Sequence, residues 1–520
     1  MAKQGKYFTA MSFGLAASIA AVWPVQAQGD IEDQIKALES EVQKIEPLKD
    51  QIERLRSQQL EMKKEATAAA AEMPTFSYRP GRGMTIAAAD KSWSFNTTYR
   101  VNIYNYNILG GKPNFNDGQE RSSGATIGEL FPRRNRLYTT MCWRDCFFQF
   151  ETSIDGETAE RDASFRDNEF MIGFNQLNPY LPYFSIGLRR GAGKTHVGRS
   201  SDNDGKMEHS VILDGFAWGG DGSHAGMGIG WEGVDIGTGE YDLFLNYVTS
   251  RQGTHQEFIN DDRKGIMGYI GGKPFANTKS KWLSGLEMGF GYQGHSLDRP
   301  ENSLDDTSGV EIRVRSVERR GRQELFRPGA LGQDPDNCQD DGVCSAQNVG
   351  SGWGHVMIPG LKWTVGPYMF RAVYIYTRYN SVDPGVGSGM WGRGFTLDHQ
   401  LMLWSPKGFF TGSQTTPNTV MLSFGFERAD MKCGSSCDAS PSTGSFHSQT
   451  VLNRETALWY WIRPSLGVGM WHHYWTSSNT PYRTQVNVGC KDGRTSALSG
   501  KGVGRSCSWH SLNTGLRFTW

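Results

Sequence analysis

Basic side chains at alternate positions of several segments have the type and spacing to bind anions. Successive residues of an extended strand point to opposite faces, so arginines two residues apart share a face. The polar faces of the alternating segments carry Arg100, Arg134, Arg136, Arg189, Arg371 and Arg517, against the acidic Glu151, Asp155, Glu169 and Glu427. More basic than acidic groups along one path would focus a positive potential there. This pattern predicts an anion path.

A polar segment after Arg190 adds a second group of cations, which comprises Lys194, Arg199 and Lys206. If segment 190–210 folds inward, these cations would build an electropositive constriction that lowers the desolvation cost for anions. The alternative is that they are solvated loop charges balanced by Asp202, Asp204 and Glu208. Both interpretations stay open on the sequence.

The eight cysteines form four pairs of near neighbours in the sequence: Cys142 with Cys146, Cys338 with Cys344, Cys433 with Cys437, and Cys490 with Cys507. Eight cysteines allow 105 connectivities, and proximity favours pairing within each couple as loop-closing disulfides. A metal site needs CxxC pairs with further ligands, and covalent haem needs CxxCH. The sequence has neither pattern, so we expect no metal and no cofactor.

The histidines raise the question of an enzyme. A barrel phospholipase or protease would need a Ser/His or Asp/His set at one rim, and His355, His472, His473 and His510 are candidates. No GxSxG motif accompanies them. We therefore expect no enzymatic activity and keep an outer-membrane barrel enzyme as a minor alternative.

The elements that carry these residues are strands, because the period is two from Lys91 to the end. In 93–103 apolar and aromatic residues alternate with polar ones, and 148–155, 370–377, 422–427 and the last ten residues repeat the pattern. Their polar faces hold the charged residues named above. The segment 91–520 is predicted to be all-β.

Alternation alone fits a soluble sandwich or a membrane barrel with its apolar face outward. Strands of about 9 to 14 residues match the length of a tilted membrane-crossing strand. Short connections alternate with long polar ones, and the chain ends on Trp520, as outer-membrane barrels end for recognition by the assembly machinery. Aromatic residues near strand ends suggest interfacial girdles: Trp93, Tyr104, Tyr106, Tyr183, Trp363, Trp404, Trp459, Trp461, Trp471 and Trp475. A membrane barrel is the prediction.

The number of strands determines whether such a barrel is open. We find 16 to 18 candidates, of which 210–218 and 309–316 are uncertain. An even total is expected, and about 16 strands leave an aqueous channel. The expected fold is therefore an antiparallel transmembrane β-barrel of 16, or otherwise 18, strands that forms a pore.

The N-terminus has the form of an export signal. Lys3 and Lys6 precede an uncharged apolar stretch, and Val25-Gln26-Ala27 resembles a signal-peptidase site. We expect 1–27 to be removed and the mature chain to enter the periplasm, where disulfides persist. An N-terminal membrane anchor is the alternative.

Residues 28–72 are predicted to form a short periplasmic coiled coil. Ile31, Ile35, Leu38, Val42 and Ile45 follow a heptad seam. The register jumps at Pro47, which predicts two helical segments with a kink. Such a polar helix has no core of its own, so it must pair with identical copies or lie on the protein's own body. Residues 73–90 are rich in proline and glycine and are predicted to form a linker before the barrel of 91–520.

Composition and charge exclude other classes. The chain has 520 residues, of which 38% are hydrophobic, with 54 basic and 54 acidic side chains and 64 glycines. Zero net charge argues against a nucleic-acid-binding protein. It is a sum of unlike parts: +2 on 1–27, −4 on 28–72 (7 basic, 11 acidic) and, by difference, +2 on 73–520.

Two regions resemble a known family. FPRRNRLYTTMCWRDCFFQFETSID (131–155) and NEFMIGFNQLNPYLPYFSIGLRRGAGK (168–194) are similar to the phosphate-selective porin O/P family, as are 395–412, 419–431 and 453–478. In that family an aromatic-Arg-Arg-x-Arg strand opens a hairpin, and a constriction loop follows the second hairpin. Arg133, Arg134 and Arg136, with Arg189 and Arg190, carry the match.

The resemblance implies a homotrimeric 16-stranded outer-membrane channel of a Gram-negative-type cell, with an N-terminal coiled coil. We therefore expect a porin surrounded by outer-membrane lipid that passes small hydrophilic solutes and prefers small anionic ones such as phosphate-like oxyanions. The alternative function is structural: the barrel would tether or space the envelope through its coiled coil, and this could coexist with a pore.

Overall fold

The computed structural model describes residues 27–110, 129–156, 164–190, 210, 216, 223–252, 258–259, 265–296, 314–315, 324–326, 352–381, 390–406, 417–433, 448–463, 465–480 and 505–520. The chain divides into two units, Met1–Met73 and Pro74–Trp520. The predicted signal peptide lies almost entirely outside the described residues, and its cleavage after Ala27 remains a prediction.

Among its described residues, the first unit contains one helix, α1 (Ala27–Glu72), which is continuous through Pro47. The helix is therefore not divided into two segments at Pro47 as predicted, whereas the kink expected there stays a prediction. Proline removes one backbone hydrogen bond, which can bend a helix without ending it. Apolar residues of α1 such as Ile35, Leu38, Ile52 and Leu55 are exposed, so the predicted heptad seam is accessible. Pairing of α1 with other copies remains a prediction. The described part of the chain contains no helix with the length and hydropathy of a membrane span.

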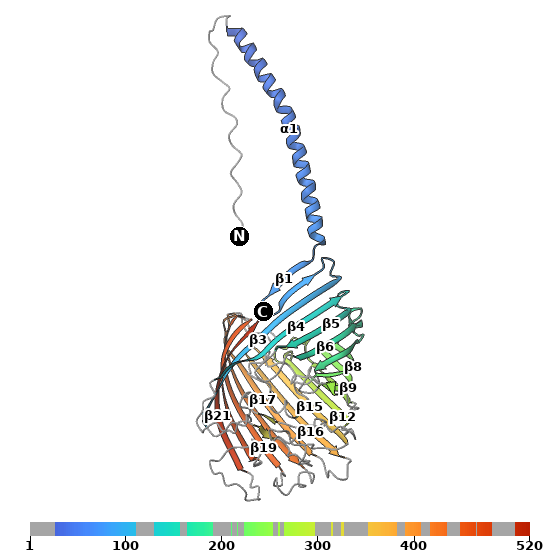
Figure 1. Cartoon of the computed structure of the whole chain (residues 1–520), viewed down its shortest axis with the longest axis vertical. Helices are drawn as coiled ribbons and strands as arrows, with labels where there is room; N and C mark the ends of the chain where they lie inside the picture. The colour runs from blue at the N-terminus through green and yellow to red at the C-terminus, as the bar shows by residue number, and fades with distance from the viewer. Residues whose placement is uncertain are drawn as a thin grey trace. The chain divides into compact units, whose positions relative to one another are not determined.

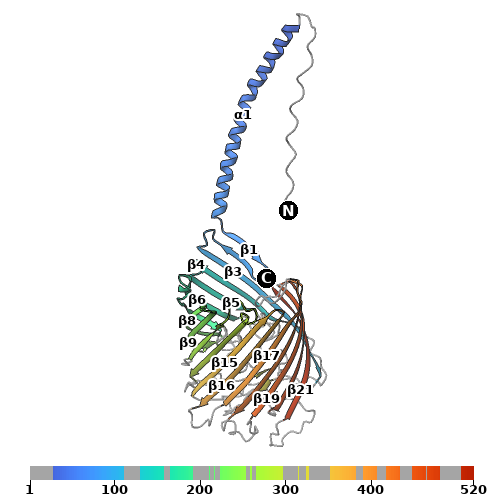
Figure 2. The ribbon, with the colours of Figure 1, turned by 180° about the vertical axis from the view of Figure 1, so that it is seen from behind.

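The second unit is a closed antiparallel barrel (Figures 1 and 2). Its main sheet has 19 strands, of which β1, β2 and β10 lie outside the closed ring, and this leaves 16. The ring strands in order are β3 (Trp93–Gly110), β4 (Glu129–Trp143), β5 (Phe148–Asp155), β6 (Ser164–Gly173), β7 (Tyr183–Arg190), β8 (Ser223–Ile236), β9 (Gly239–Gln252), β11 (Gly265–Lys273), β12 (Leu286–Ser296), β15 (Gly352–Val365), β16 (Tyr368–Ser381), β17 (Met390–Trp404), β18 (Thr419–Cys433), β19 (Ser448–Arg463), β20 (Leu466–Thr480) and β21 (Arg505–Thr519). The predicted 16-stranded barrel is confirmed.

The ring closes where the last strand pairs with the first. β21 runs along β3 from Thr519 opposite Arg100 to His510 opposite Gly110, and the backbones of Trp520 and Tyr99 exchange two hydrogen bonds. Next to this point the hairpin of β1 (Thr75–Arg79) and β2 (Gly83–Ala87) continues along β3, because β2 pairs with residues 94–97. The Tyr78 ring lies 6.1 Å from that of Trp520. The hairpin therefore extends the wall beside the C-terminus.

The uncertain candidate strands are not part of the ring. In 210–218 the described residues are Ser210 and Phe216, and neither is in a strand. In 309–316 lies β13 (Val314–Arg315), which pairs with β14 (Glu324–Phe326) in a separate two-stranded sheet. β10 (Phe258–Ile259) pairs antiparallel with the last two residues of β9, and the short helix η1 (Phe174–Gln176) lies in the connection from β6 to β7.

The connections alternate in length, as the sequence predicts. We call the end with tight connections, such as 237–238 between β8 and β9, the short-turn end. The opposite end, with connections such as 111–128, 191–222 and 297–351, is the long-loop end.

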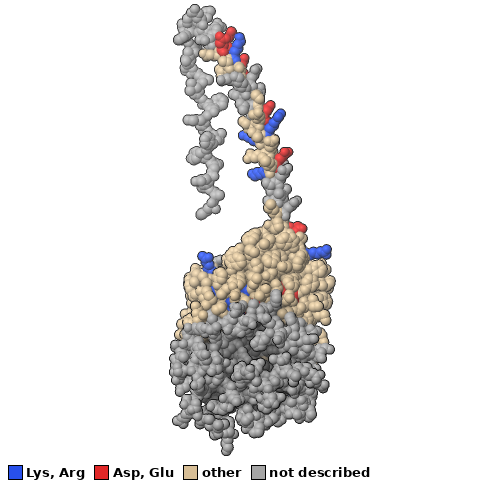
Figure 3. All heavy atoms as spheres, viewed as in Figure 1, with Lys and Arg blue, Asp and Glu red and all other residues tan. Residues whose placement is uncertain are grey.

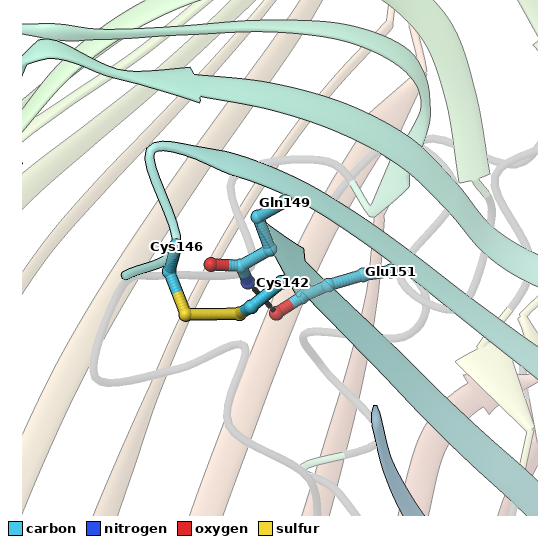
Figure 4. The surroundings of a disulfide bond; sticks show 4 residues. All are labelled: Cys142, Cys146, Gln149 and Glu151. Atoms are coloured by element: carbon cyan, nitrogen blue, oxygen red, sulfur yellow. Dashed lines mark hydrogen bonds between the residues drawn. A yellow bond between two sulfur atoms is a disulfide. The ribbon is translucent and has the colours of Figure 1, made fainter. Parts of the chain in front are cut away.

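A disulfide closes the turn between β4 and β5 at the short-turn end (Figure 4). It joins Cys142 and Cys146, whose Cα atoms are 4.4 Å apart, as predicted. The turn holds Arg144, Asp145 and Cys146 at φ of 51°, 53° and 64°, a region that side chains other than glycine rarely adopt. The disulfide therefore fixes a locally unfavourable turn.

The other three predicted disulfides do not appear in the described part of the chain. They are Cys338 with Cys344, Cys433 with Cys437, and Cys490 with Cys507. Cys338, Cys344, Cys437 and Cys490 lie outside the described residues, and at Cys433 and Cys507 only the backbone is described. The expectation of four disulfides is therefore confirmed for one couple and stays a prediction for these three.

Removing the disulfide between Cys142 and Cys146 is expected to destabilise the barrel modestly. The closed loop is short, so replacing both cysteines with serine is expected to lower the free energy of unfolding by about 2 kcal/mol. Urea unfolding of the refolded barrel in detergent measures the change, and a reductant should not alter the double variant further at this turn. An unchanged midpoint would mean that the turn is held by its backbone hydrogen bonds, such as Arg144 N to Ser92 O at 2.7 Å.

Candidate pore lining

Strand pairing assigns each residue to the inside or the outside of the barrel. Cross-strand partners share a face, and the buried charged residues form one continuous set: Arg136 opposite Asp155, Arg371 opposite Asp398 and Glu427 opposite Asn453. In a closed barrel, buried charged residues on one face mark the inner wall. The opposite face is therefore the outer wall.

The outer wall is apolar. It exposes Ile186, Met227, Leu245, Ile266, Ile270, Met288, Phe290, Leu403, Phe424, Leu458 and Met470. On the face seen in Figure 3, the described barrel surface is mainly uncharged, whereas α1 carries many charges. At the short-turn end the exposed aromatic residues form a girdle: Trp93, Trp143, Phe174, Tyr180, Trp282, Trp404 and Trp520. An apolar band beside an aromatic girdle is the surface of a barrel that faces lipid.

A bulge in β4 concentrates arginines on the inner wall. Asn102 pairs with Arg134 and Ile103 with Pro132, so Arg133 is the extra residue. Both Arg133 and Arg134 are buried, at 5% and 1% exposure. A bulge re-aims a side chain that strict alternation would send to the other face. It therefore adds Arg133 to the inward Arg134 and Arg136.

The arginines at the bulge belong to a larger group of cations on neighbouring strands. We call Arg100, Arg133, Arg134, Arg136 and Arg517, from β21, β3 and β4, the arginine sector. The guanidinium carbon of Arg100 lies 5.0 Å from the centre of the Tyr138 ring. Arg517 donates from Nε to the Tyr104 hydroxyl at 3.0 Å and lies 4.3 Å from the Trp459 ring centre.

Carboxylates on the inner wall correct the expectation that basic groups outnumber acidic ones. The described wall carries the arginine sector with Lys362 and Arg371, against Glu151, Asp155, Glu169, Glu287, Asp398, Glu427 and Glu455. These basic groups do not outnumber the acidic ones. Three cations form ion pairs, namely Arg136 with Asp155 at 2.7 Å, Arg371 with Asp398 at 2.8 Å and Lys362 with Glu287 at 3.6 Å. The wall is thus divided into charged sectors rather than uniformly positive.

The predicted eyelet residues fall into two groups. The structure places Arg100, Arg134, Arg136 and Arg371 on the inner wall, from β3, β4 and β16. The side chain of Arg189 in β7 and the residues Lys194, Arg199 and Lys206 lie outside the described part of the chain. The role of all these residues in selectivity remains a prediction.

Several aromatic residues assigned to the outer girdle lie inside the barrel, so that assignment is wrong. We call Tyr104, Tyr106, Met421, Ala457, Trp459, Trp461 and Trp471 the inner aromatic band; all are buried and contact one another. The rings of Trp459 and Trp461 are stacked with centres 5.2 Å apart, and Trp471 meets Trp459 edge-on at 4.5 Å. Trp475 is also inside, and Tyr183 belongs to a second buried cluster with Phe244 and Tyr269. An aromatic residue near the end of a strand can face either side of the barrel wall, and the strand register shows which side it faces.

Glycines on neighbouring strands accommodate these rings. A Cβ atom at Gly469 would lie 2.7 Å from the Trp459 ring, one at Gly467 2.7 Å from Trp461, and one at Gly515 2.4 Å from Tyr104. The missing side chains let each ring lie against the adjacent strand. This pairing explains part of the high glycine content.

Adding a methyl group under one ring is expected to destabilise the barrel. The Trp459 ring is confined by Trp471 and Arg517, so Gly469→Ala is expected to cost about 1–3 kcal/mol of overpacking. The matched control is Gly268→Ala, whose Cβ would meet ordinary contacts at 3.5 and 3.6 Å. Urea titrations followed by tryptophan fluorescence compare the two variants. Equal midpoints would refute the close fit.

The connection from β7 to β8 reaches the opposite side of the barrel. Phe216, within 191–222, is fully buried, and a Cβ atom at Gly392 would lie 2.8 Å from its ring and 3.2 Å from Thr377 Cγ2. Gly392 of β17 and Thr377 of β16 are paired inward positions. Five strands, β9, β11, β12, β15 and β16, separate β8 from β17. Phe216 therefore places part of this connection against the far inner wall.

The histidines do not gather at one rim. His472 and His510 face outward and lie 3.1 Å apart between Nε2 and Nδ1. His355 faces outward with its Nδ1 2.8 Å from the Tyr292 hydroxyl. His473 is buried inside beside Asn453. Among the described residues, no group of three or more histidine, cysteine or acidic side chains is placed to hold a metal ion.

Comparison with known proteins gives structural neighbours. No family model matches the chain, and no curated protein matches it. Solved structures that align include a loop-deleted form of OmpT, an outer membrane protein of Vibrio cholerae, with TM-score 0.48, 7% identity, and coverage of 82% of this chain and 100% of that one. The outer membrane channel DcaP of Acinetobacter baumannii aligns with TM-score 0.45, 10% identity, and coverage of 82% and 98%. OprB of Pseudomonas putida aligns with TM-score 0.46, 8% identity, and coverage of 83% and 95%. The sixteen-strand architecture rests on the strand pairing itself, and the resemblance to the phosphate-selective porin O/P family stays a prediction.

Proposed function

We propose that the chain is an outer-membrane porin that passes small hydrophilic solutes and prefers small anions such as phosphate-like oxyanions. The proposal rests on the contrast between the two faces of the barrel wall: the outer wall is apolar, and the inner wall holds buried charges. A barrel of about 16 strands has room for an aqueous path.

The arginine sector supports the preference for anions. Its five guanidinium groups come from three adjacent strands, whereas the described inner carboxylates are spread over β5, β6, β12, β17, β18 and β19. Arginine matches oxyanions with a planar, bidentate geometry and stays charged at all relevant pH values. Four of the five side chains are buried, so a solute that passes this side of the lumen would experience their positive potential rather than contact them.

Electrical recording tests the channel and its selectivity together. Purified protein in a planar bilayer should give discrete conductance steps, and a salt gradient should give a reversal potential of the sign for anions. An absence of current would overturn the channel proposal. A cation-selective current would overturn only the anion preference.

We propose a homotrimer as the assembled form. The outer wall of β20, β21 and β3 supports this, because it carries polar groups among apolar ones: Asn105, Asn107, His472, His510 and Thr514. Polar side chains facing lipid are costly, and contact with another copy would cover them. Light scattering in detergent measures the assembly. Deletion of 28–72 separates the contributions, since a monomer would assign trimerisation to α1, whereas an intact trimer would assign it to the barrel wall.

A tethering role for α1 is the second candidate. Its 46 residues, whose described side chains are exposed, would extend about 70 Å as a helix, enough to reach periplasmic partners. We further propose that the C-terminal Trp520 engages the barrel-assembly machinery and that the chain is not an enzyme. Envelope defects caused by deletion of 28–72 with normal conductance would favour tethering.

A further inference from the structure

Five cations face outward near the long-loop ends of four consecutive strands. We call this set the outer cationic patch: Arg378 of β16, Arg393 of β17, Arg428 and Lys432 of β18, and Arg454 of β19. Their side chains are exposed, and strand pairing places them on one face, since Arg378 and Lys432 both pair with Trp391. Near the same end of β9 and β11 the exposed outward residues include the uncharged Tyr247 and Ile266. The five cations are therefore gathered on one side of the outer wall.

The length of these strands places the patch at the edge of the hydrocarbon layer. β16, β17, β18 and β19 have 14, 15, 15 and 16 residues, whereas a tilted strand needs about 9–11 residues to cross that layer. The aromatic girdle, with Trp404 at the end of β17, marks the boundary at the short-turn end, so the extra residues extend past the opposite boundary. Arg454, which lies deepest, follows Ser448 at the long-loop end of β19 by six residues (454 − 448). A cation that faces lipid is far less costly near this boundary than at the midplane.

The patch carries an excess of positive charge. Asp430 is the one acidic side chain among the described outward residues of β16–β19, so five cations and one carboxylate give a net charge of +4. Asp430 accepts a hydrogen bond from Arg428 Nη2 at 3.0 Å and lies 3.6 Å from Arg393 Nε. The amine of Lys432 and the guanidinium carbon of Arg393 lie 5.4 and 5.8 Å from the Trp391 ring centre. These contacts orient the cations on the wall without neutralising the patch.

An apolar surface continues from the patch toward the middle of the wall. Phe395 pairs with Arg428 and Phe426 pairs with Arg454, and the two phenylalanine rings lie 5.7 Å apart. Phe424, two residues further along β18, is 46% exposed. A phosphorylated lipid has the same order of groups, with anionic oxygens in the head-group layer and acyl chains below it. Arginine binds phosphate oxygens with a planar, bidentate geometry.

Charge distinguishes such a lipid from a second copy of the chain. The outward polar residues of β20, β21 and β3 that we assign to contact between copies, such as Asn105 and Thr514, include no carboxylate. They would leave a surface of net charge +4 unmatched, whereas phosphate groups would match it. The long loops of outer-membrane barrels are extracellular, so the long-loop end lies in the outer leaflet.

We propose that the outer cationic patch binds the phosphorylated head groups of outer-leaflet lipids, whose acyl chains lie against Phe395, Phe424 and Phe426. The binding anchors this side of the barrel to the outer leaflet. It goes beyond the proposed channel function and requires no current through the lumen.

Native mass spectrometry of the full-length protein in a neutral detergent measures this binding, with diphosphoryl lipid A as the probe. One variant combines Arg393→Gln, Lys432→Gln and Arg454→Gln and keeps the pair of Arg428 with Asp430. Its apparent affinity for the probe should fall about tenfold or more, because three cations that can bond phosphate oxygens are lost.

The matched control combines Arg79→Gln, Lys281→Gln and Arg463→Gln. These three exposed residues lie at the short-turn end and carry the same total charge, so the control should bind the probe as the wild type does. An equal loss in both triple variants, or no loss in either, would overturn the proposal.

The wild-type protein alone tests the class of ligand. It should bind diphosphoryl lipid A more tightly than monophosphoryl lipid A, and both more tightly than phosphatidylethanolamine, whose amine offsets its phosphate. Equal binding of the three lipids would rule out recognition of phosphate. If the patch variant became monomeric while its lipid binding stayed unchanged, the patch would be a contact between copies and the proposal would be wrong. A wild-type protein that gave no current would overturn the channel function and leave these binding results unaffected.

Discussion

Replacing Arg133 and Arg134 together with glutamate is expected to abolish or reverse the anion preference of the channel. Both residues are buried on the inner wall, Arg134 through the regular alternation of β4 and Arg133 through the bulge. Two reversals change the local charge by four units at a low-dielectric wall, where charge interactions are only partly screened. We expect the anion-to-cation permeability ratio to fall at least about tenfold, which corresponds to about 1.4 kcal/mol.

The reversal potential in a tenfold salt gradient measures this change. The matched control is Arg54→Glu with Arg56→Glu, which makes the same change in total charge on exposed α1 and should leave the reversal potential as in the wild type. If the two double variants shift it equally, the arginine sector does not set selectivity and the effect comes from overall charge. If neither shifts it, the cations of 191–222 become the better candidates, and Lys194→Glu with Arg199→Glu tests them.

Breaking one buried ion pair is expected to have the largest effect on stability. Arg371 donates from Nε and Nη2 to Oδ2 of Asp398 at 3.0 and 2.8 Å, and both side chains are nearly inaccessible. Arg371→Met or Asp398→Leu alone leaves a buried charge without its opposite. Each is expected to lower the free energy of unfolding by about 3–5 kcal/mol.

The double variant Arg371→Met with Asp398→Leu is the control, because removing both charges together avoids the unpaired group and is often nearly neutral. It should recover most of the lost stability. Urea unfolding and the temperature at which the folded band disappears on gels provide two independent readouts. A double variant as unstable as the sum of the single ones would mean that the pair contributes little and that packing dominates the site.

Much of the barrel was predictable because strand alternation is a local property. In 148–155 and 422–427 the apolar and polar faces read from sequence are the outer and inner faces of β5 and β18. The same parity places Arg134, Arg136 and Arg371 on the inner wall. The disulfide between Cys142 and Cys146 was predictable from its separation of four residues. In each case the signal needs only neighbouring residues.

Properties that depend on pairing between distant segments were not predictable. Trp459 and Trp471 have the type and position of girdle residues, yet their register places them inside, with Trp459 over Gly469 of the neighbouring strand. The inner carboxylates Glu287, Asp398 and Glu455, which balance the cations, were not predicted from the sequence. Their position on the inner face follows from pairing with Lys362, Arg371 and His473 on neighbouring strands.

The sequence by itself predicted a barrel of 16 to 18 strands with its polar face inward and a helical N-terminal segment, because the hydrophobic period and the strand lengths can be read along the chain. Only the tertiary structure decided which aromatic residues line the interior, how the inner charges are grouped, and that Phe216 reaches a wall far from the strands next to it in the sequence. Those facts arise from ring closure, which brings together residues hundreds of positions apart and leaves no local pattern from which to read them.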